Sequence, residues 1–264
     1  MAFRFHKMHG LGNDFVVIDA RARSVAMDAA RARAIADRRL GIGCDQLILI
    51  EPSQVADARM RIFNADGGEV EACGNAARCV ALLLGESSTI ETLGGLIRGE
   101  ARAEGVSVDM GLPRFDWNAI PLAYAMDTAA MPVGWEGLER PMAVNVGNPH
   151  VIFFVADTDA VDLERLGPII EHDPLFPDRI NVNVATVEGR DRIRLRVWER
   201  GVGLTQACGT GACATAVAAI RSGRVDAPVT VELPGGPLVI DWREGSPIMM
   251  TGPATHVFTA EAEL

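Results

Sequence analysis

Lysine is almost absent from this chain of 264 residues, since Lys7 is the only one and every other basic side chain among its 25 Lys and Arg residues is arginine. A pyridoxal phosphate enzyme forms a Schiff base with a lysine, so Lys7 would be the only candidate for that chemistry. The Gly-Lys-Ser/Thr segment of a P-loop is missing as well. The sequence therefore argues against a P-loop protein and leaves one position for pyridoxal phosphate.

Long apolar runs are also missing. The longest, near Val151–Val155, is far too short to span a bilayer, and residues 1–7 have no apolar signal core. Five cysteines, an odd number in a chain of this size, argue against a secreted disulfide scaffold. A net charge of −10 and a pI near 5.0 argue against a nucleic-acid or membrane surface. We expect a soluble, reduced, cytoplasmic protein that binds neither nucleic acid nor membrane.

The polar landmarks of the chain occur twice at a constant spacing. Cys73-Gly74-Asn75 returns 135 residues later as Cys208-Gly209-Thr210. The same spacing relates Gly12-Asn13 to Gly147-Asn148, Gln46 to Asn181, Phe63 to Trp198 and Asn64 to Glu199. Several matches in one register predict a duplicated domain. We expect an N-terminal half over 1–117 with Cys73 and a C-terminal half over 118–264 with Cys208, and residues 252–264 can pack on the first half.

Strands dominate the predicted secondary structure. Short β-branched runs such as Phe15–Ile18 and Leu47–Ile50 are typical of strands. Two amphipathic segments predict outer helices, Asp28–Arg39 with Asp28 as N-cap, and Ala160–Glu171.

Two further segments differ, because Ala76–Leu84 and Ala212–Ile220 have almost no polar face. Such a helix is buried at the centre of a domain. The expected fold is α+β, with two pseudo-symmetric domains, each a mostly antiparallel sheet wrapped around one central helix. We expect the active site in the cleft between them.

Cys73 and Cys208 each directly precede one of these central helices. A helix start offers unpaired N–H groups and partial positive charge, which lower a thiol pKa from about 8.5 to roughly 3.5–7.5. The same start binds a carboxylate on backbone N–H groups, here those of Gly74, Asn75, Gly209 and Thr210. A single cysteine at such a position is more often a core residue. Two in register favour a pair in which one thiol is general base and the other general acid.

The other three cysteines, Cys44, Cys79 and Cys213, are expected to pack in the core. Cys73 and Cys79 are six residues apart and Cys208 and Cys213 five, which does not fit a zinc thiolate pair, so we predict no metal site. A Cys-x-x-Cys pair is missing, which argues against a thiol redox protein.

A set of uncharged polar side chains accompanies the thiols: Asn13, Gln46, Asn64, Asn148 and Asn181. Asparagine beside glycine usually indicates a turn, but the pairing by a constant spacing favours a binding set. Asparagine can donate to a carboxylate and accept from an ammonium group. Arg200 can hold a carboxylate and Glu199 an ammonium. The combination predicts a site for an amino-acid zwitterion.

Two further motifs carry less weight. His150 is more often a structural residue, although its nearness to Asn148 leaves a supporting role beside the thiols open. Gly10-Leu11-Gly12 is not a dinucleotide loop, because a strand follows it instead of a helix and the third glycine is missing.

The motifs together resemble the diaminopimelate epimerase family over the whole chain and in the right order. They are Met8–Phe15, Gly43–Gln46, Phe63–Gly67, Cys73–Cys79, Gly147–His150, Arg179–Asn181, Glu199–Gly203 and Ala207–Cys213. Two departures from the family pattern stand out, Leu204 where glutamate is usual and Ala76 where a second glycine is usual. Neither removes a proposed proton carrier.

The resemblance implies a cofactor-independent isomerase that interconverts LL- and meso-diaminopimelate for lysine and peptidoglycan synthesis by a two-base mechanism. Cys73 and Cys208 would be the two acid/base thiols. The reacting end of the substrate would lie among Asn13, Gly74, Asn75, Gly209 and Thr210, and the distal end would bind Asn64, Asn181, Glu199 and Arg200, with Asn148 nearby. The family also implies domains that close over the substrate and a homodimer.

Competing interpretations remain at this point. A proline or hydroxyproline racemase would share the paired thiols but needs no distal clamp. A non-catalytic amino-acid binding protein would explain the asparagines and Arg200 but not two reactive thiols.

Overall fold

The computed structural model describes residues 2–70, 73–102 and 105–263, which form two compact units. The first consists of Met1–Asp109 with Thr251–Leu264, and the second of Met110–Met250. The boundary predicted after residue 117 therefore falls inside the second unit. The tail belongs to the first unit because its strand β19 (Thr255–Glu263) pairs antiparallel with β1 (Ala2–Gly10).

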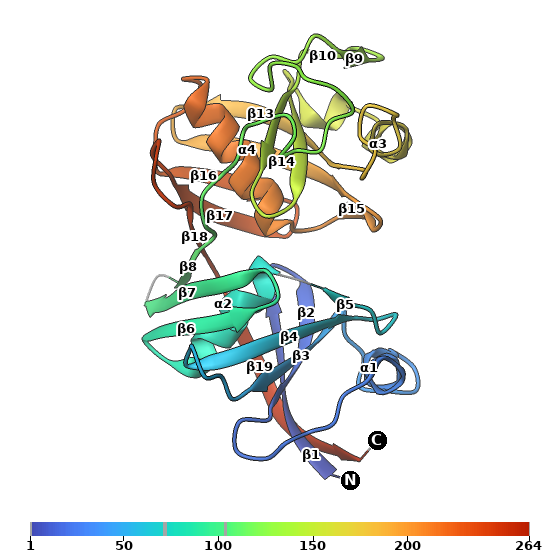
Figure 1. Ribbon diagram of the computed structural model, residues 1–264, viewed down its shortest axis with the longest axis vertical. Coiled ribbons are helices and arrows are strands. Elements are labelled where there is room, and N and C mark those ends of the chain that lie inside the picture. The colour runs from blue at the N-terminus through green and yellow to red at the C-terminus, as the bar shows by residue number, and fades with distance from the viewer. Residues whose placement is uncertain (1, 71–72, 103–104, 264) are drawn as a thin grey trace. The chain divides into compact units, whose positions relative to one another are not determined.

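Over its described residues, the first unit is a mixed sheet with two helices (Figure 1). Its other strands are β2 (Asn13–Asp19), β3 (Gln46–Glu51), β4 (Ala58–Asn64), β5 (Glu69–Val70), β6 (Ser87–Thr92), β7 (Gly95–Arg102) and β8 (Gly105–Asp109), and its helices are α1 (Ala29–Ala36) and α2 (Gly74–Leu84). Most neighbours are antiparallel, but β2 pairs parallel with β3 and β4 with β6. Parallel neighbours need a crossover connection, which α1 and α2 supply.

The second unit repeats this plan. Its strands are β9 (Gly134–Trp135), β10 (Leu138–Glu139), β11 (Met142–Asn145), β12 (Pro149–Phe154), β13 (Asn181–Gly189), β14 (Arg192–Glu199), β15 (Gly203–Thr205), β16 (Val229–Leu233) and β17 (Gly236–Asp241), with β18 (Met249–Gly252) at its end. Its helices are the 3₁₀ turn η1 (Thr158–Ala160), α3 (Leu163–Glu171) and α4 (Gly209–Arg221). The parallel pairs are β12 with β13 and β14 with β16.

Strand register preserves the spacing of 135 residues. Phe15 pairs with Gln46 in the first unit, and His150 pairs with Asn181 in the second. Likewise, Ile62 pairs with Val70 and Val197 with Thr205. The duplication predicted from polar motifs thus extends to backbone pairing, and the expected pseudo-symmetric α+β fold is confirmed.

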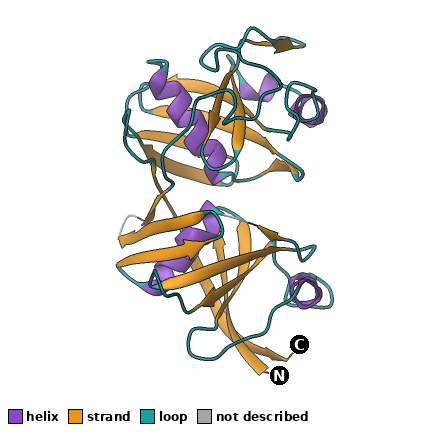
Figure 2. Cartoon of the chain, viewed as in Figure 1, coloured by secondary structure: helices purple, strands orange, loops and turns teal. Residues whose placement is uncertain are grey.

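Each unit surrounds one helix with strands (Figure 2). The N-terminal residues 74–81 of α2 are buried, and α4 is buried at nearly every position from Gly209 to Ala219. Helix α2 contacts β1 and β2 as well as β6, β7 and β8, so the sheet curves around it. Helix α4 contacts β11 to β14 and β16 and β17 in the same way. A helix without a polar face satisfies its burial requirement only in such a position.

The two outer helices begin close to their expected starts. Asp28 caps α1 by accepting a hydrogen bond from the Arg31 backbone N–H at 2.8 Å. The helix ends at Ala36, three residues before the expected end, where the Asp37 carboxylate accepts from the backbone N–H groups of Arg39 and Leu40. Side-chain acceptors of this kind compete with helix propagation.

Candidate active site

Each predicted thiol stands at the N-cap of its buried helix. Cys73 precedes α2 and Cys208 precedes α4, and both have extended backbone conformations. The Sγ atom of Cys208 accepts from the backbone N–H of Gly211 at 3.4 Å. The sequence-based placement of both cysteines at helix starts is therefore confirmed.

Around Cys73, two predicted asparagines meet. The Cys73 Sγ atom lies 3.9 Å from Asn13 Oδ1, and Asn75 Nδ2 donates to the same oxygen at 3.3 Å. On its other side, Asn13 Nδ2 donates to Asp45 Oδ2 at 3.1 Å. The buried Arg78 donates to Asn75 Oδ1 at 2.9 Å. These contacts fix both amides so that the Asn13 carbonyl oxygen points to the thiol.

Asp45 belongs to a charged cluster beside this thiol. Asp14 forms ion pairs with Lys7 and Arg38, and Arg38 also reaches Asp45 at 2.6 Å. The hydrogen bonds from both bases hold the pKa of Asp14 down at about 2 against the opposing effect of burial. The only lysine of the chain is thus in an ion pair, and it also donates to the carbonyl of Gly43.

Gln46 and Asn64 form a separate polar pair on neighbouring strands. Gln46 Nε2 donates to Asn64 Oδ1 at 2.9 Å, because the two residues are register partners on β3 and β4. Gln46 Oε1 is buried and has no hydrogen-bond donor among the described residues. An acceptor that lacks a donor among the described residues is suited to an ammonium group or another donor from outside.

Around Cys208, a hydroxyl and a carboxylate compete for the thiol. Thr210 Oγ1 lies 3.5 Å from Sγ, and the charge of Glu199 acts on the pKa of the same thiol. Thr205 Oγ1 donates to Glu199 Oε1 at 2.5 Å. Burial raises the pKa of Glu199, and the hydrogen bonds from Thr205 and Cys208 oppose that effect.

The expected lowering of the thiol pKa is wrong for Cys208. Burial is the largest cause and the Glu199 charge the next, and together they raise the Cys208 pKa well above its ordinary value. Hydrogen bonds from Thr210 and Gly211 act in the opposite direction but do not prevail. The sequence pattern showed the helix start, but not the half-buried carboxylate of Glu199 that acts on the thiol.

His150 lies at the centre of the remaining polar group. Its ring is fully buried, Nε2 lies 2.9 Å from Asn148 Oδ1, and Asn183 Nδ2 lies 3.1 Å from Nδ1. Burial lowers the His150 pKa to about 3, so the ring is neutral at physiological pH. Asn148 Nδ2 in turn donates to Thr210 Oγ1 at 3.3 Å.

Two buried side chains, Asn181 and Glu171, hold the turn that carries Glu199 and Arg200. The Arg200 backbone N–H donates to Asn181 Oδ1 at 3.0 Å, and Asn181 Nδ2 donates to the Pro149 carbonyl. Glu171, only 2% exposed, accepts from the Gly201 N–H at 2.9 Å and from the Trp198 indole at 2.7 Å. The Arg200 guanidinium donates to the Asp178 carbonyl.

The predicted site residues therefore form two polar groups, one around Cys73 in the first unit and one around Cys208 in the second, as the duplication predicts. Asn13 and Asn75 meet at Cys73, whereas Thr210 meets Cys208 and links it to Asn148 and His150. Glu199, assigned from the resemblance to the distal end of the substrate, lies against the Cys208 thiol itself.

Four supporting residues did not emerge from the sequence: Asp45, Glu171, Asn183 and Thr205. Asp45 lies within the Gly43–Gln46 motif, and Thr205 directly follows the departure from the family pattern at Leu204. Glu171 and Asn183 gave no signal, because the duplication pairs them with Ala36 and Ile48 in the first unit.

The other three cysteines, Cys44, Cys79 and Cys213, are core residues, as expected. Burial raises the pKa of Cys44 to about 11 and that of Cys79 to about 12. Cys213 is buried as well. Among residues 2–70, 73–102 and 105–263, no three His, Cys, Asp or Glu side chains are grouped to hold a metal ion. No described helix combines the length and apolar character needed to cross a membrane.

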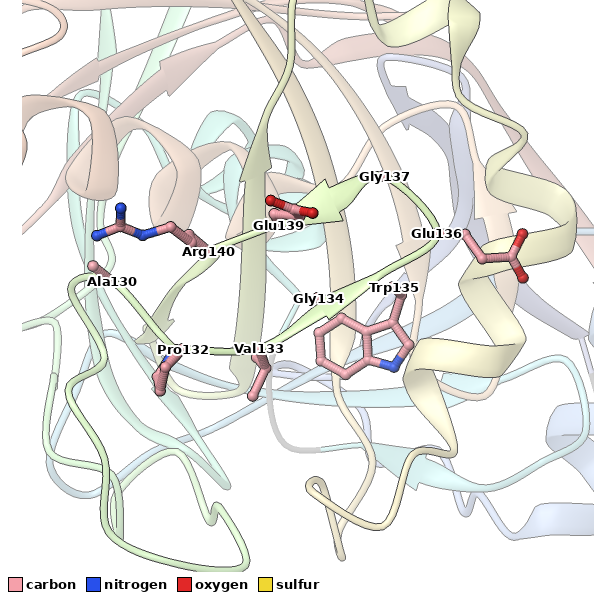
Figure 3. A pocket seen from close by; sticks show the side chains of 9 residues that line it. All are labelled: Ala130, Pro132, Val133, Gly134, Trp135, Glu136, Gly137, Glu139 and Arg140. Carbon is pink, nitrogen blue, oxygen red and sulfur yellow. The ribbon is translucent and has the colours of Figure 1, made fainter.

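A depression of about 620 Å³ lies beside the β9–β10 hairpin (Figure 3). Its described lining, Ala130 with 132–137, Glu139 and Arg140, includes none of the predicted site residues. The Trp135 ring stacks on Phe176 and its Nε1 donates to Asp173 at 2.9 Å. The largest aromatic group there is therefore engaged within the fold.

Solved structures share this fold along the whole chain. A phenazine biosynthesis protein of the PhzF family from Bacillus anthracis matches with a TM-score of 0.71 at 17% identity and covers 100% of both chains. A probable proline racemase from Agrobacterium radiobacter matches with a TM-score of 0.69 at 16% identity and covers 99% of this chain and 93% of that one. At these identities the likeness establishes the fold alone.

Sequence comparison identifies the class and then the family. The family model for diaminopimelate epimerase matches residues 5–115 and 142–257. A diaminopimelate epimerase from Rhizorhabdus wittichii is 76% identical over 265 residues, covering 100% of this chain and 97% of that protein. The class is thus that of the isomerases that racemise or epimerise amino acids. Within it, the chain belongs to the diaminopimelate epimerase family.

Proposed function

We propose that this protein interconverts LL- and meso-diaminopimelate without a cofactor, by inverting one α-carbon. The observation that carries the proposal is the duplicated helix start, with Cys73 before α2 and Cys208 before α4. Membership in the family supports the choice of substrate. The reaction belongs to lysine and peptidoglycan biosynthesis.

In the proposed mechanism, two sulfur atoms act on opposite faces of the α-carbon. One Sγ, as thiolate, takes the α-proton, and the other Sγ–H delivers a proton to the opposite face. The thiols leave the turnover with their protonation states exchanged, so the reverse reaction uses the same pair. Burial and the Glu199 charge raise the Cys208 pKa and so favour the protonated form of this thiol.

Charge develops on the substrate carboxylate side as the α-proton leaves. Preorganised N–H donors stabilise such charge without reorganisation during the reaction. In the proposal, these donors are the backbone N–H groups of the first residues of both buried helices, Gly74, Asn75, Gly209 and Thr210. Asn13 lies beside the Cys73 thiol. Where water is excluded from around the substrate, each of these interactions is stronger.

The distal amino-acid end of the substrate is assigned to Asn64, Asn181, Glu199 and Arg200, with Gln46 and Asn148 beside them. The open acceptor at Gln46 Oε1 supports this assignment, because an ammonium group would supply the missing donor. For Arg200, the support is a turn fixed by Asn181 and Glu171, which holds a long side chain at a defined position.

Deuterium incorporation tests the proposal. The reduced protein, free of cofactor, is incubated with LL-diaminopimelate in D₂O, and the α-proton signal and the meso product are followed by NMR. We expect deuterium at the α-carbon together with meso product. Cys73→Ser and Cys208→Ser should each abolish epimerisation in both directions, whereas Cys79→Ser, a change at a buried core thiol, should retain it.

Other outcomes have distinct meanings. Exchange with proline or hydroxyproline instead of diaminopimelate would keep the thiol chemistry and overturn the substrate. Binding without exchange for any of these substrates would favour a binding protein. Near-normal turnover by Cys73→Ser would refute the two-base scheme.

We further propose that the protein acts in the cytoplasm as a homodimer, as the family resemblance implies. Light scattering would then give twice the 28.2 kDa mass of one chain. A monomeric mass at micromolar concentration would contradict this.

A further inference from the structure

Asn183, on β13, lies between His150 and Gly211, two residues of the polar group around Cys208. Its Nδ2 atom lies 3.1 Å from His150 Nδ1 and donates to the Val151 carbonyl at 3.1 Å. Its Oδ1 atom is buried without a donor among the described residues. A Cβ atom added to Gly211 would come within 2.8 Å of that oxygen, so the amide packs directly against the residue whose N–H supports Cys208.

The Val151 carbonyl settles the orientation of this amide. A carbonyl oxygen is an acceptor only, so the atom that faces it must be the NH₂ group. The Asn181 carbonyl, at 3.5 Å from the same atom, agrees with that orientation. The second proton of the NH₂ group is then directed to His150 Nδ1, which must be the unprotonated ring nitrogen.

Each later hydrogen bond follows from this one. With Nδ1 unprotonated, the neutral His150 ring carries its proton on Nε2 and donates to Asn148 Oδ1 at 2.9 Å. Asn148 then presents its Nδ2 to Thr210 Oγ1 at 3.3 Å. Because Thr210 accepts there, its single hydroxyl proton is left for the Cys208 sulfur at 3.5 Å. Every donor in the series points toward the thiol.

We propose that Asn183 is a positioning residue that sets the direction of this series of hydrogen bonds, and so makes Thr210 a donor to Cys208. The functional meaning rests on the proposed role of Cys208 as an acid/base group. In the direction in which Cys208 must give up its proton, a hydroxyl donor stabilises the thiolate. The fixed donor opposes the charge of Glu199, which favours the protonated form of the thiol.

The charged groups that act on this series are few and lie on identified elements. Glu199, at the end of β14, acts on Cys208, and Arg200, which follows it, acts on His150. Both remain in place when Asn183 is changed. If the reactivity of Cys208 changes when Asn183 is substituted, the cause is therefore the altered series of hydrogen bonds and not the loss of a nearby charge.

Nitrogen NMR of the His150 ring tests the direction without substrate. In protein labelled with ¹⁵N-histidine, the His150 signals are assigned by their loss in His150→Gln. We expect the Nε2–H tautomer in the wild type between pH 7 and 8. In Asn183→Asp, an acceptor faces Nδ1, and we expect the proton on Nδ1. An Nδ1–H ring in the wild type, or an unchanged tautomer in Asn183→Asp, would overturn the proposal.

Thiol alkylation measures the consequence at Cys208. Asn183→Leu removes the donor without adding charge, and the rate of iodoacetamide reaction at each cysteine is read by mass spectrometry across pH. We expect about tenfold slower reaction of Cys208 at a fixed pH below its pKa, equivalent to one pKa unit, and an unchanged rate at Cys73. Val184→Ala, which removes buried volume from the same strand, is the matched control and should leave the Cys208 rate unchanged.

Equal rates in Asn183→Leu and wild type would refute the positioning role. An equal loss in Val184→Ala would also refute it, because packing would then be the cause. Neither measurement needs diaminopimelate, so failure of the proposed function appears separately, as missing deuterium exchange in the wild type.

Discussion

Acid should destabilise the second unit through His150, well above the pH at which carboxylates titrate. The ring is fully buried and neutral, and burial lowers its pKa to about 3. In the unfolded chain the same ring titrates near 6.5. Below that pH the ring is protonated in the unfolded state but not in the folded state. The free energy of unfolding is therefore highest above pH 6.5 and falls as the pH decreases toward 3.

The size of the effect follows from the two pKa values. Each pH unit below 6.5 contributes about 1.4 kcal/mol until the folded ring also titrates. Between pH 7 and pH 5 the free energy of unfolding should therefore fall by about 2 kcal/mol through this residue alone. Asp14 loses its stabilising effect only below its unfolded pKa of 3.8, down through about 2, and it lies in the first unit.

Tryptophan fluorescence isolates the relevant unit. All four tryptophans, Trp117, Trp135, Trp198 and Trp242, lie within Met110–Met250. Urea unfolding curves at pH 7 and pH 5 are compared for the wild type and His150→Gln, which cannot titrate. We expect the pH-dependent loss to be about 2 kcal/mol smaller in the variant. Equal losses in the two proteins would refute the assignment of a buried, neutral ring.

Three further predictions concern supporting residues. Glu171→Gln places an amide N–H against the Gly201 N–H or the Trp198 indole. We expect the free energy of unfolding in urea to fall by about 1–3 kcal/mol and the KM for diaminopimelate to rise. An unchanged KM would contradict the role of this carboxylate in holding the turn of Glu199 and Arg200. Asp45→Ala frees the Asn13 amide, and we expect kcat/KM to fall about tenfold, since hydrogen bonds to charged groups contribute roughly 1.5–3 kcal/mol and Asp45 is partly exposed. Cys79, with a pKa raised to about 12, should resist iodoacetamide at pH 8 in the folded protein, and rapid labelling there would show that α2 opens.

The sequence predicted what depends on repetition and periodicity. The spacing of 135 residues located both thiols, and it is reproduced in the pairing of Phe15 with Gln46 and of His150 with Asn181. Absence of a polar face predicted that α2 and α4 are central. Repeats and periodic patterns of polar and apolar residues are visible in a single sequence, so no structure is needed to recognise them.

Features that depend on burial and on contacts outside the repeat were not predictable in this way. The raised pKa of Cys208 comes from burial and from the charge of Glu199. Glu171 and Asn183 break the duplication, because Ala36 and Ile48 stand at the equivalent positions. The sequence allowed the tail to pack on the first half but did not identify its partner strand, since β19 returns to β1 from the far end of the chain.

That return has a consequence for synthesis on the ribosome. Met110–Met250 is one continuous segment, whereas Ala2 pairs with Glu263, so β1 cannot gain this partner until translation has passed the whole second unit. We expect the later segment to reach its native form first in the nascent chain, while the earlier one waits with an open strand edge. An unpaired edge invites association with other chains. The interval before release is therefore when the newly made protein depends most on chaperones.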